Sequence, residues 1–288
     1  MSQMKRGYAN TREGQVHYTE AGTGPSLFML HPSPQSARVY WRLMPCLATQ
    51  FRVVTPDTLG FGYSDPIPNG ITMPRLAGSV SEIMDALQIE SAHIFGFHTG
   101  NKIAAALASD MPERTERLIL CGQTHSLIAD QESRIAAFGP ITDRYFDAEN
   151  AEKETESNAG AHEQWAMEMF ADISRLWFDK RAAEEFGYTE KLRHYLSARI
   201  MDLLQAKPSA TTIYDANFNF DFEAALRRVS APTLIIEVAS TAEEHLGRQA
   251  DRLAGLMLNA KAATIEEGDR EVLEMRVDEV LGLILGFL

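Results

Sequence analysis

The sequence predicts an α/β fold: a mostly parallel, twisted β-sheet with helices on both faces. Two observations lead to this prediction. Short apolar runs alternate with segments of helical periodicity through residues 1–125 and again near the C-terminal end, whereas residues 126–225 show helical periodicity without a convincing buried strand. Strands that alternate with helices form parallel sheets. We therefore expect a core made of residues 1–125 and 226–288, with residues 126–225 inserted as a helical cap.

The expected strands are short runs that, apart from the first, are apolar enough to be buried on both faces. In chain order they are Gln15–Glu20, which alternates polar and apolar residues, then Ser26–Leu30, Phe51–Val54, His93–Gly96, Leu118–Cys121, Pro232–Val238 and Ala262–Ile265. The expected helices have apolar residues at helical spacing and are Tyr40–Ala48, Met73–Leu87, Asn101–Ser109 and Val272–Leu288. The segment Met1–Asn10 is polar and lacks the apolar run of a signal peptide.

The composition excludes several classes of partner. The 288 residues include 27 Lys and Arg against 40 Asp and Glu, which gives a net charge of −13. Nucleic acids and anionic membranes bind basic surfaces, so neither is expected as a partner. No run approaches the ~18 apolar residues of a membrane span. Cys46 and Cys121 are interpreted as buried free thiols in a reducing compartment. We expect a cytoplasmic protein that binds a small molecule, and the sequence leaves monomer and homodimer both open.

Ligands of open α/β sheets bind beyond the carboxyl ends of the strands. Three segments are expected there. His31-Pro32-Ser33-Pro34 follows one strand, Gly96-Phe97-His98-Thr99-Gly100 forms a tight turn between a strand and a helix, and Glu266–Asp269 follows the last strand. The histidines have no metal-ligand spacing, and no metal or organic cofactor is implied.

These segments resemble the α/β-hydrolase superfamily, in the branch that includes epoxide hydrolases, haloalkane dehalogenases and many esterases. Residues 31–34 match its H-G-x-P segment in part, and Pro56–Asp65 matches its D-x-x-G-x-G-x-S-D loop. Gly22–Pro25 and Ala231–Leu234 add to the resemblance. It implies the α/β-hydrolase fold with a cap over the active site. Residues 96–100 then correspond to G-x-S-x-G, the nucleophile elbow.

The catalytic positions depart from the family pattern. His98 stands at the nucleophile position. The region of the family's acid holds Ser240 and Thr241. The position of the general-base histidine is taken by Asp269 in one alignment and by Arg270 in another. The triad is therefore degenerate, and ordinary acyl-enzyme chemistry on a serine is not expected.

A histidine at the elbow still suits catalysis. The resemblance implies that the backbone N–H groups of Ser33 and Thr99 form an oxyanion hole. The positive end of the following helix disfavours a charged imidazole, and a neutral imidazole can accept a proton or attack an electrophile. If Asp269 reaches the other ring nitrogen of His98, the two form an oriented dyad.

Three functions follow as hypotheses. The first is hydrolysis of a small, apolar or aromatic ester, lactone or thioester, with His98 as general base or nucleophile. The second is a cofactor-free lyase or carbon–carbon bond-cleaving enzyme in which His98 moves a proton. The third is a ligand-binding protein without activity. Further candidate pocket residues are His125, Trp165 and Trp177.

Overall fold

In the computed structural model the described residues are 4–122, 164, 167–168, 170–171, 190–206, 209–239, 248–266, 268 and 272–288. These residues form an eight-stranded sheet in the order β1-β2-β4-β3-β5-β6-β7-β8. The strands are β1 (Lys5–Thr11), β2 (Gly14–Ala21), β3 (Ser26–Leu30), β4 (Arg52–Pro56), β5 (Ala92–Phe97), β6 (Thr115–Cys121), β7 (Thr233–Val238) and β8 (Ala260–Ile265). The pairings β1/β2 and β2/β4 are antiparallel and the rest are parallel, which confirms the mostly parallel sheet.

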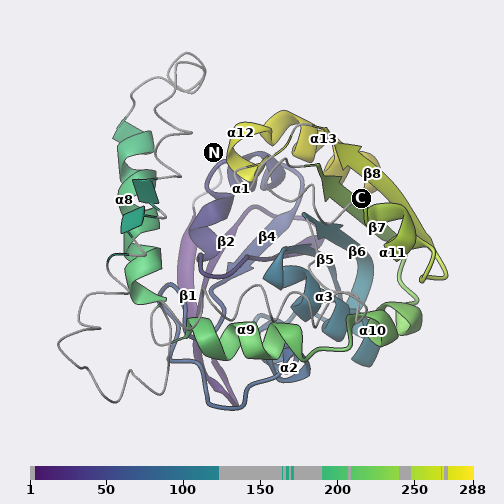
Figure 1. Cartoon of the computed structure of the whole chain (residues 1–288), viewed down its shortest axis with the longest axis horizontal. Helices are drawn as coiled ribbons and strands as arrows, with labels where there is room; N and C mark the ends of the chain where they lie inside the picture. Colours follow the sequence, from purple (N-terminus) through teal and green to yellow (C-terminus); the bar gives the residue numbers. More distant parts are fainter. Residues whose placement is uncertain are drawn as a thin grey trace.

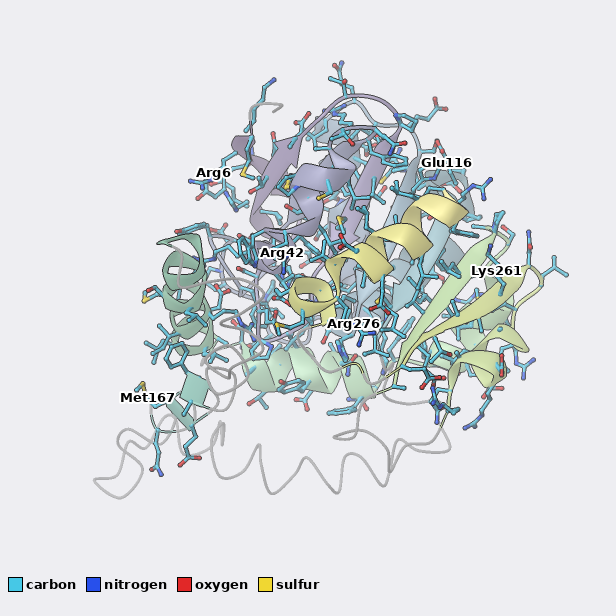
Figure 2. All side chains as sticks on the ribbon, turned by 90° about the horizontal axis from the view of Figure 1, so that it is seen from above. Arg6, Arg42, Glu116, Met167, Lys261 and Arg276 are labelled. Atoms are coloured by element: carbon cyan, nitrogen blue, oxygen red, sulfur yellow. The ribbon has the colours of Figure 1, made fainter. Side chains whose placement is uncertain are left out.

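Helices cover both faces of the sheet (Figure 1). One face packs against α2 (Met73–Ala86), α3 (Thr99–Asp110) and α10 (Phe222–Arg228), and the other against α1 (Leu43–Leu47), α12 (Val272–Met275) and α13 (Val277–Phe287). Figure 2 shows α13 lying across the second face, beside α1. Successive side chains of a strand point to opposite faces. Phe28 and Leu30 of β3 accordingly enter the first core, and Leu27 and Met29 enter the second.

The described residues between β6 and β7 contain helices and no strand, in the region where the sequence places the cap. They include α8 (Glu190–Gln205) and α9 (Ala210–Phe218), which precede α10. The buried Lys102 of α3 joins this segment to the core. Its Nζ donates to the carbonyl of Asn217 at 2.6 Å and lies 5.8 Å from the ring centre of Phe222. The proposed cap boundaries at residues 126 and 225 stay a prediction.

Short elements complete the described chain: the 3-10 turns η1 (Ala37–Tyr40) and η2 (Pro112–Arg114), and α11 (Ala250–Ala254). No described helix combines the length and the apolarity that crossing a bilayer requires.

The structure adds one strand to the sequence prediction and differs from it in three details. The added strand is β1, which the polar N-terminal segment forms at the edge of the sheet and in which Ala9 alone is buried. The helix expected at Tyr40–Ala48 is divided into η1 and α1, and the last helix is interrupted at Arg276. Cys46 is exposed rather than buried. Cys121 is buried as expected, and burial raises the pKa of its thiol to about 12, so it stays protonated.

Candidate active site

His98 is the single residue between β5, which ends at Phe97, and α3, which begins at Thr99, so it forms the turn between them. Its backbone has φ +48° and ψ −109°, a conformation that residues other than glycine rarely adopt. The His98 N–H donates to the carbonyl of Cys121 at 3.2 Å, and the His98 carbonyl accepts from the Asn101 N–H at 2.9 Å. Strained backbone of this kind is concentrated at functional sites. The half-buried imidazole lies edge-on to the Phe97 ring, with 4.4 Å between ring centres.

The two glycines of this segment are explained by close backbone contacts. A Cβ atom at Gly100 would lie 2.0 Å from the carbonyl oxygen of Leu30, at the end of β3. A Cβ atom at Gly96 would lie 2.6 Å from the carbonyl oxygen of Gly100. Both distances are far shorter than a van der Waals contact. Only glycine therefore allows α3 to start so close to the ends of β3 and β5, as an elbow requires.

The side chain of Asn101 anchors the first turn of α3 to β6. Its Nδ2 donates to the Cys121 carbonyl at 2.8 Å, and its Oδ1 accepts from the Cys121 N–H at 3.0 Å. Asn101 is fully buried. Since the same carbonyl also accepts the His98 N–H, the anchor and the elbow share one backbone group. The sequence analysis did not identify this role, because no motif marks a contact between residues 20 positions apart.

The structure brings Ser33 and Thr99 together. The Ser33 N–H donates to the hydroxyl oxygen of Thr99 at 3.3 Å, across 66 positions of the chain. Thr99 is buried, and its own N–H is the first of α3. That N–H makes no hydrogen bond to any other described residue. The two residues expected at the oxyanion hole are thus in contact with each other, and Thr99 directly follows His98 in the chain.

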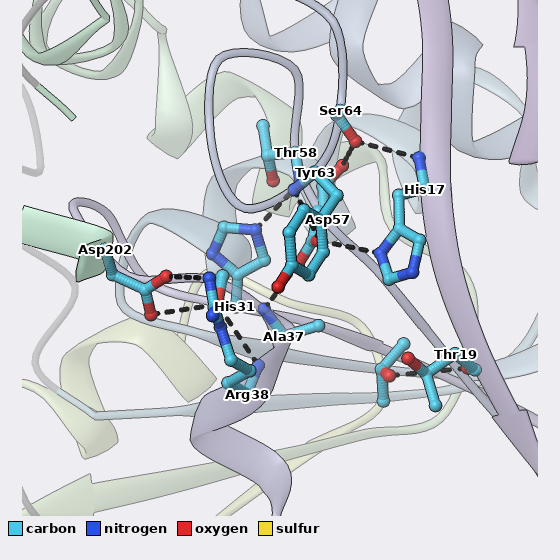
Figure 3. A network of polar contacts seen from close by, with 12 residues as sticks. His17, Thr19, His31, Ala37, Arg38, Asp57, Thr58, Tyr63, Ser64 and Asp202 are labelled. Carbon is cyan, nitrogen blue, oxygen red and sulfur yellow. Dashed lines mark hydrogen bonds and ion pairs between the residues drawn. The ribbon is translucent and has the colours of Figure 1, made fainter. Parts of the chain in front are cut away.

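The loop that carries Ser33 is held by His31 (Figure 3). The Nε2 atom of His31 accepts from the Thr58 N–H at 2.8 Å, so Nε2 carries no proton, and Nδ1 donates to the Pro32 carbonyl at 2.9 Å. This arrangement fits a neutral imidazole. Burial lowers the pKa of His31, which keeps it neutral. His31 is therefore a structural residue that joins the two loops of the family motifs.

Asp57 is the second anchor of these loops (Figure 3). Its carboxylate accepts from His17 Nδ1 at 2.8 Å, from the Ala37 N–H at 2.8 Å and from the Tyr63 N–H at 3.1 Å. Burial by itself would raise the pKa of Asp57, but these hydrogen bonds outweigh it and hold the pKa below its ordinary value. The carboxylate is thus ionised and accepts three hydrogen bonds from these loops, so we assign it to holding the loops in place.

Asp202 connects α8 to the turn that follows β3. It accepts from Ser36 Oγ at 2.9 Å and from Arg38 Nη2 at 2.6 Å, as Figure 3 shows. Burial raises the pKa of Asp202 to about 6, although Arg38, Ser36 and the nearby Arg199 act against it. Nothing in the sequence indicated this contact, because Arg38 and Asp202 lie 164 positions apart.

Other predicted positions are not placed by the structure. Asp269, His125, Trp165 and Trp177 lie outside the described residues, as do Ser240, Thr241 and Arg270. Within the described ranges, no three His, Cys, Asp or Glu side chains gather as a metal site would require. A small cavity beneath α2 is lined by residues that include Leu30, Leu76 and Ile103 but neither His98 nor Ser33, so we do not assign substrate to it.

Known proteins share part of this sequence. A 2-hydroxymuconate semialdehyde hydrolase of Pseudomonas sp. (strain CF600) is 41% identical over 107 residues, which are 36% of this chain and 38% of that protein. A soluble epoxide hydrolase of Corynebacterium sp. (strain C12) is 32% identical over 119 residues, 41% of this chain and 42% of the relative. The chain thus covers about two fifths of the length of these relatives.

Solved structures match over nearly the whole chain. An epoxide hydrolase from Vigna radiata has a TM-score of 0.72 at 14% identity and covers 99% of this chain and 97% of its own. A thermophilic esterase from Thermogutta terrifontis has a TM-score of 0.71 at 18% identity, with coverage of 98% and 97%. At these identities the likeness concerns the fold. The family model of the α/β hydrolase fold matches residues 25–236, and the chain therefore belongs to the α/β-hydrolase fold family.

Proposed function

We propose that the protein is a hydrolase that cleaves a small, apolar or aromatic ester, lactone or thioester at His98. The observation that carries the proposal is the position of His98 at the elbow, next to Thr99 and Ser33. It puts a base and nucleophile beside donors suited to a developing negative charge on oxygen. The two relatives named above are hydrolases, which supports hydrolysis as the type of reaction.

The imidazole can act in two ways. As a general base it takes a proton from water while the water oxygen bonds to the acyl carbon. The carbonyl electrons move onto oxygen, the bond to the leaving group then breaks, and the leaving group takes the proton from the imidazolium. As a nucleophile it bonds to the acyl carbon and expels the leaving group, which takes the proton that the acylated ring loses from its other nitrogen. Water then hydrolyses the acyl-imidazole and restores the neutral imidazole. Both routes give an acid and an alcohol or thiol.

Four residues outside the described ranges complete the proposal. Asp269 is proposed to accept the second ring N–H of His98, which orients the imidazole and stabilises the imidazolium. His125, Trp165 and Trp177 are proposed to line the substrate pocket. The two tryptophans are the reason for proposing an apolar or aromatic substrate.

The test is hydrolysis of p-nitrophenyl acetate by wild type, His98→Ala and His98→Gly. Loss of a positioned base or nucleophile should lower the rate by at least about 100-fold in both variants. Glycine at position 98 also relieves the backbone strain, so His98→Gly should be more stable than wild type by about 1 kcal/mol. A variant that gains stability while losing activity excludes misfolding as the cause. Mass spectrometry of the quenched wild-type enzyme reveals an acyl-imidazole if His98 is the nucleophile.

The outcomes separate the three hypotheses. Full activity in His98→Ala would refute the proposed mechanism. If the wild type hydrolyses no ester, the lyase and the ligand-binding protein replace the hydrolase as candidates, and analysis of the products from carbon–carbon bond-cleavage substrates decides between those two.

A further inference from the structure

The hydroxyl oxygen of Thr99 lies where a substrate oxygen would have to lie to accept the Ser33 N–H. The nitrogen of Ser33 is 3.3 Å from this oxygen. An amide carries a single N–H hydrogen, which makes one strong hydrogen bond. While Thr99 keeps this position, Ser33 cannot donate fully to a second oxygen. The oxyanion hole as the sequence predicts it is thus occupied from within by a side chain of the protein.

The hydroxyl that accepts this bond still has a proton to donate, since a hydroxyl is both donor and acceptor. Inside a helix, a threonine hydroxyl often donates to the carbonyl four residues earlier. Thr99 is the first residue of α3, and Phe95, four residues earlier, belongs to β5. No hydrogen bond from the Thr99 hydroxyl to another described residue occurs. The proton therefore remains available to a ligand beside His98.

We propose that Thr99 is a further catalytic residue, whose hydroxyl donates to the oxyanion in place of the Ser33 amide; this inference rests on the proposed hydrolysis at His98. The bonds form a chain from the Ser33 N–H to Thr99 Oγ1, and from the Thr99 hydroxyl to the substrate oxygen. The first bond polarises the hydroxyl and makes it a stronger donor. The Thr99 N–H at the positive end of α3 is the second donor. One residue thus supplies both donors.

The surroundings keep this chain of bonds in place. Thr99 is only 7% exposed, so bulk water competes little for its hydroxyl, and its branched side chain has few rotamers. Ser33 lies in a loop whose neighbours are fixed, by His31 before it and by the bond from the Ala37 N–H to Asp57 after it. A donor held in advance of the reaction stabilises the transition state without the cost of reorganisation.

Three variants test the proposal: Thr99→Val, which keeps the shape of the side chain without its hydroxyl, Thr99→Ala, and Thr99→Ser, which restores the hydroxyl. In p-nitrophenyl acetate hydrolysis, kcat of the valine and alanine variants should fall by about 10- to 100-fold, with KM changed by less than about threefold. The loss stays below that of a complete donor deletion because the Ser33 N–H becomes available. Thr99→Ser should recover kcat to within about fivefold of wild type.

A binding measurement makes the test independent of turnover. The monophenyl ester of methylphosphonic acid is a stable anion that resembles the tetrahedral intermediate, and its affinity is measured by calorimetry. Thr99→Val should bind it at least tenfold more weakly than wild type and Thr99→Ser do. Since Thr99→Val also loses the bond from Ser33, thermal unfolding is recorded for each variant, and Thr99→Ala replaces it if the valine variant does not fold.

Two results would overturn the inference. An unchanged or higher kcat in Thr99→Val would show that the Ser33 amide donates directly and that the hydroxyl obstructs the hole. Equal phosphonate affinity in wild type and Thr99→Val, or no binding to either, would show that the hydroxyl does not meet an anion. Either result is compatible with loss of activity in His98→Ala, so failure of this inference is distinguishable from failure of the proposed function.

Discussion

Substitution of Gly100 by alanine tests the elbow most directly, because the three atoms nearest to the added methyl group would all be backbone atoms. It would lie 2.0 Å from the carbonyl oxygen of Leu30, 2.6 Å from the Leu30 carbonyl carbon and 3.1 Å from the carbonyl oxygen of His31. The Leu30 oxygen cannot easily move, since it also accepts the Tyr40 hydroxyl at 2.8 Å. β3 itself is hydrogen-bonded on both sides, to β4 and β5. The start of α3 must therefore shift by more than about 1 Å to reach a normal contact distance.

A methyl group added to a well-packed interior typically lowers the unfolding free energy by about 1–3 kcal/mol, in cases where neighbouring side chains can move aside. At Gly100 the nearest atoms are backbone atoms, which cannot move aside as side chains do. Gly100→Ala is therefore expected to lower the unfolding free energy by at least about 3 kcal/mol, the top of that range.

Gly78→Ala is the matched control. Gly78 lies within α2, and a Cβ atom there would have nothing within 4 Å. The unfolding free energy of the control variant should rise by about 0.5–1 kcal/mol, because alanine favours the helix over the unfolded chain more than glycine does.

Urea unfolding followed by circular dichroism compares wild type with both variants, using the midpoint and the slope of each transition. The structure requires opposite signs for the same chemical change at two helical glycines. If Gly100→Ala stays within about 1 kcal/mol of wild type, the close approach of α3 to β3 is wrong, and with it the placement of His98.

Two further predictions concern the anchor of α3 and the contact of α8. Asn101→Leu removes both hydrogen bonds to Cys121 and leaves a buried N–H without its acceptor, so the urea midpoint should fall by the equivalent of about 2–3 kcal/mol; an unchanged midpoint would show that the anchor is dispensable. The pKa of Asp202 is raised from 3.8 to about 6 in the folded protein, so between these pH values the folded protein holds a proton that the unfolded chain releases. The contribution of Asp202 to the unfolding free energy therefore falls as the pH rises between these values. The unfolding free energy of Asp202→Asn minus that of wild type should therefore increase by about 2–3 kcal/mol when the pH is raised from 4 to 7. Thermal unfolding across this range measures the difference, and a constant difference would contradict the raised pKa.

Strands that are buried on both faces were predictable, because such a strand must be a continuous apolar run. The prediction for β3 agrees with the structure in full, that for β5 is one residue short at each end, and that for β7 begins one residue early. β1 could not be found in this way. It lies at the edge of the sheet, pairs with β2 alone and has one buried residue, so its sequence shows no apolar signal.

The elbow was also predictable, because the segment from Gly96 to Gly100 satisfies its backbone demands within five neighbouring residues. The supporting contacts were not. Asp57 meets His17 across 40 positions, and Asp202 meets Ser36 across 166. Asp57 belongs to a family motif, but nothing in the segments of His17, Ser36 or Asp202 indicates a partner. The contact exists only because the sheet order brings the segments together, and this is information that local spacing does not contain.

Two of the three departures from the family pattern, at the nucleophile and at the general-base histidine, are chemically connected. A serine at the elbow is a weak nucleophile until a second residue removes its proton, and the histidine that the family places near the C-terminal end does this. An imidazole needs no such help, because in its neutral form it is already a base and a nucleophile. With His98 at the elbow a second histidine has no proton to remove, and no histidine follows His245 in this chain. In the proposed mechanism, the donors for the oxyanion are the backbone N–H and the hydroxyl of Thr99, and they serve a tetrahedral intermediate whichever atom formed it. The fold can therefore keep its oxyanion chemistry while one residue at the elbow takes the roles of two.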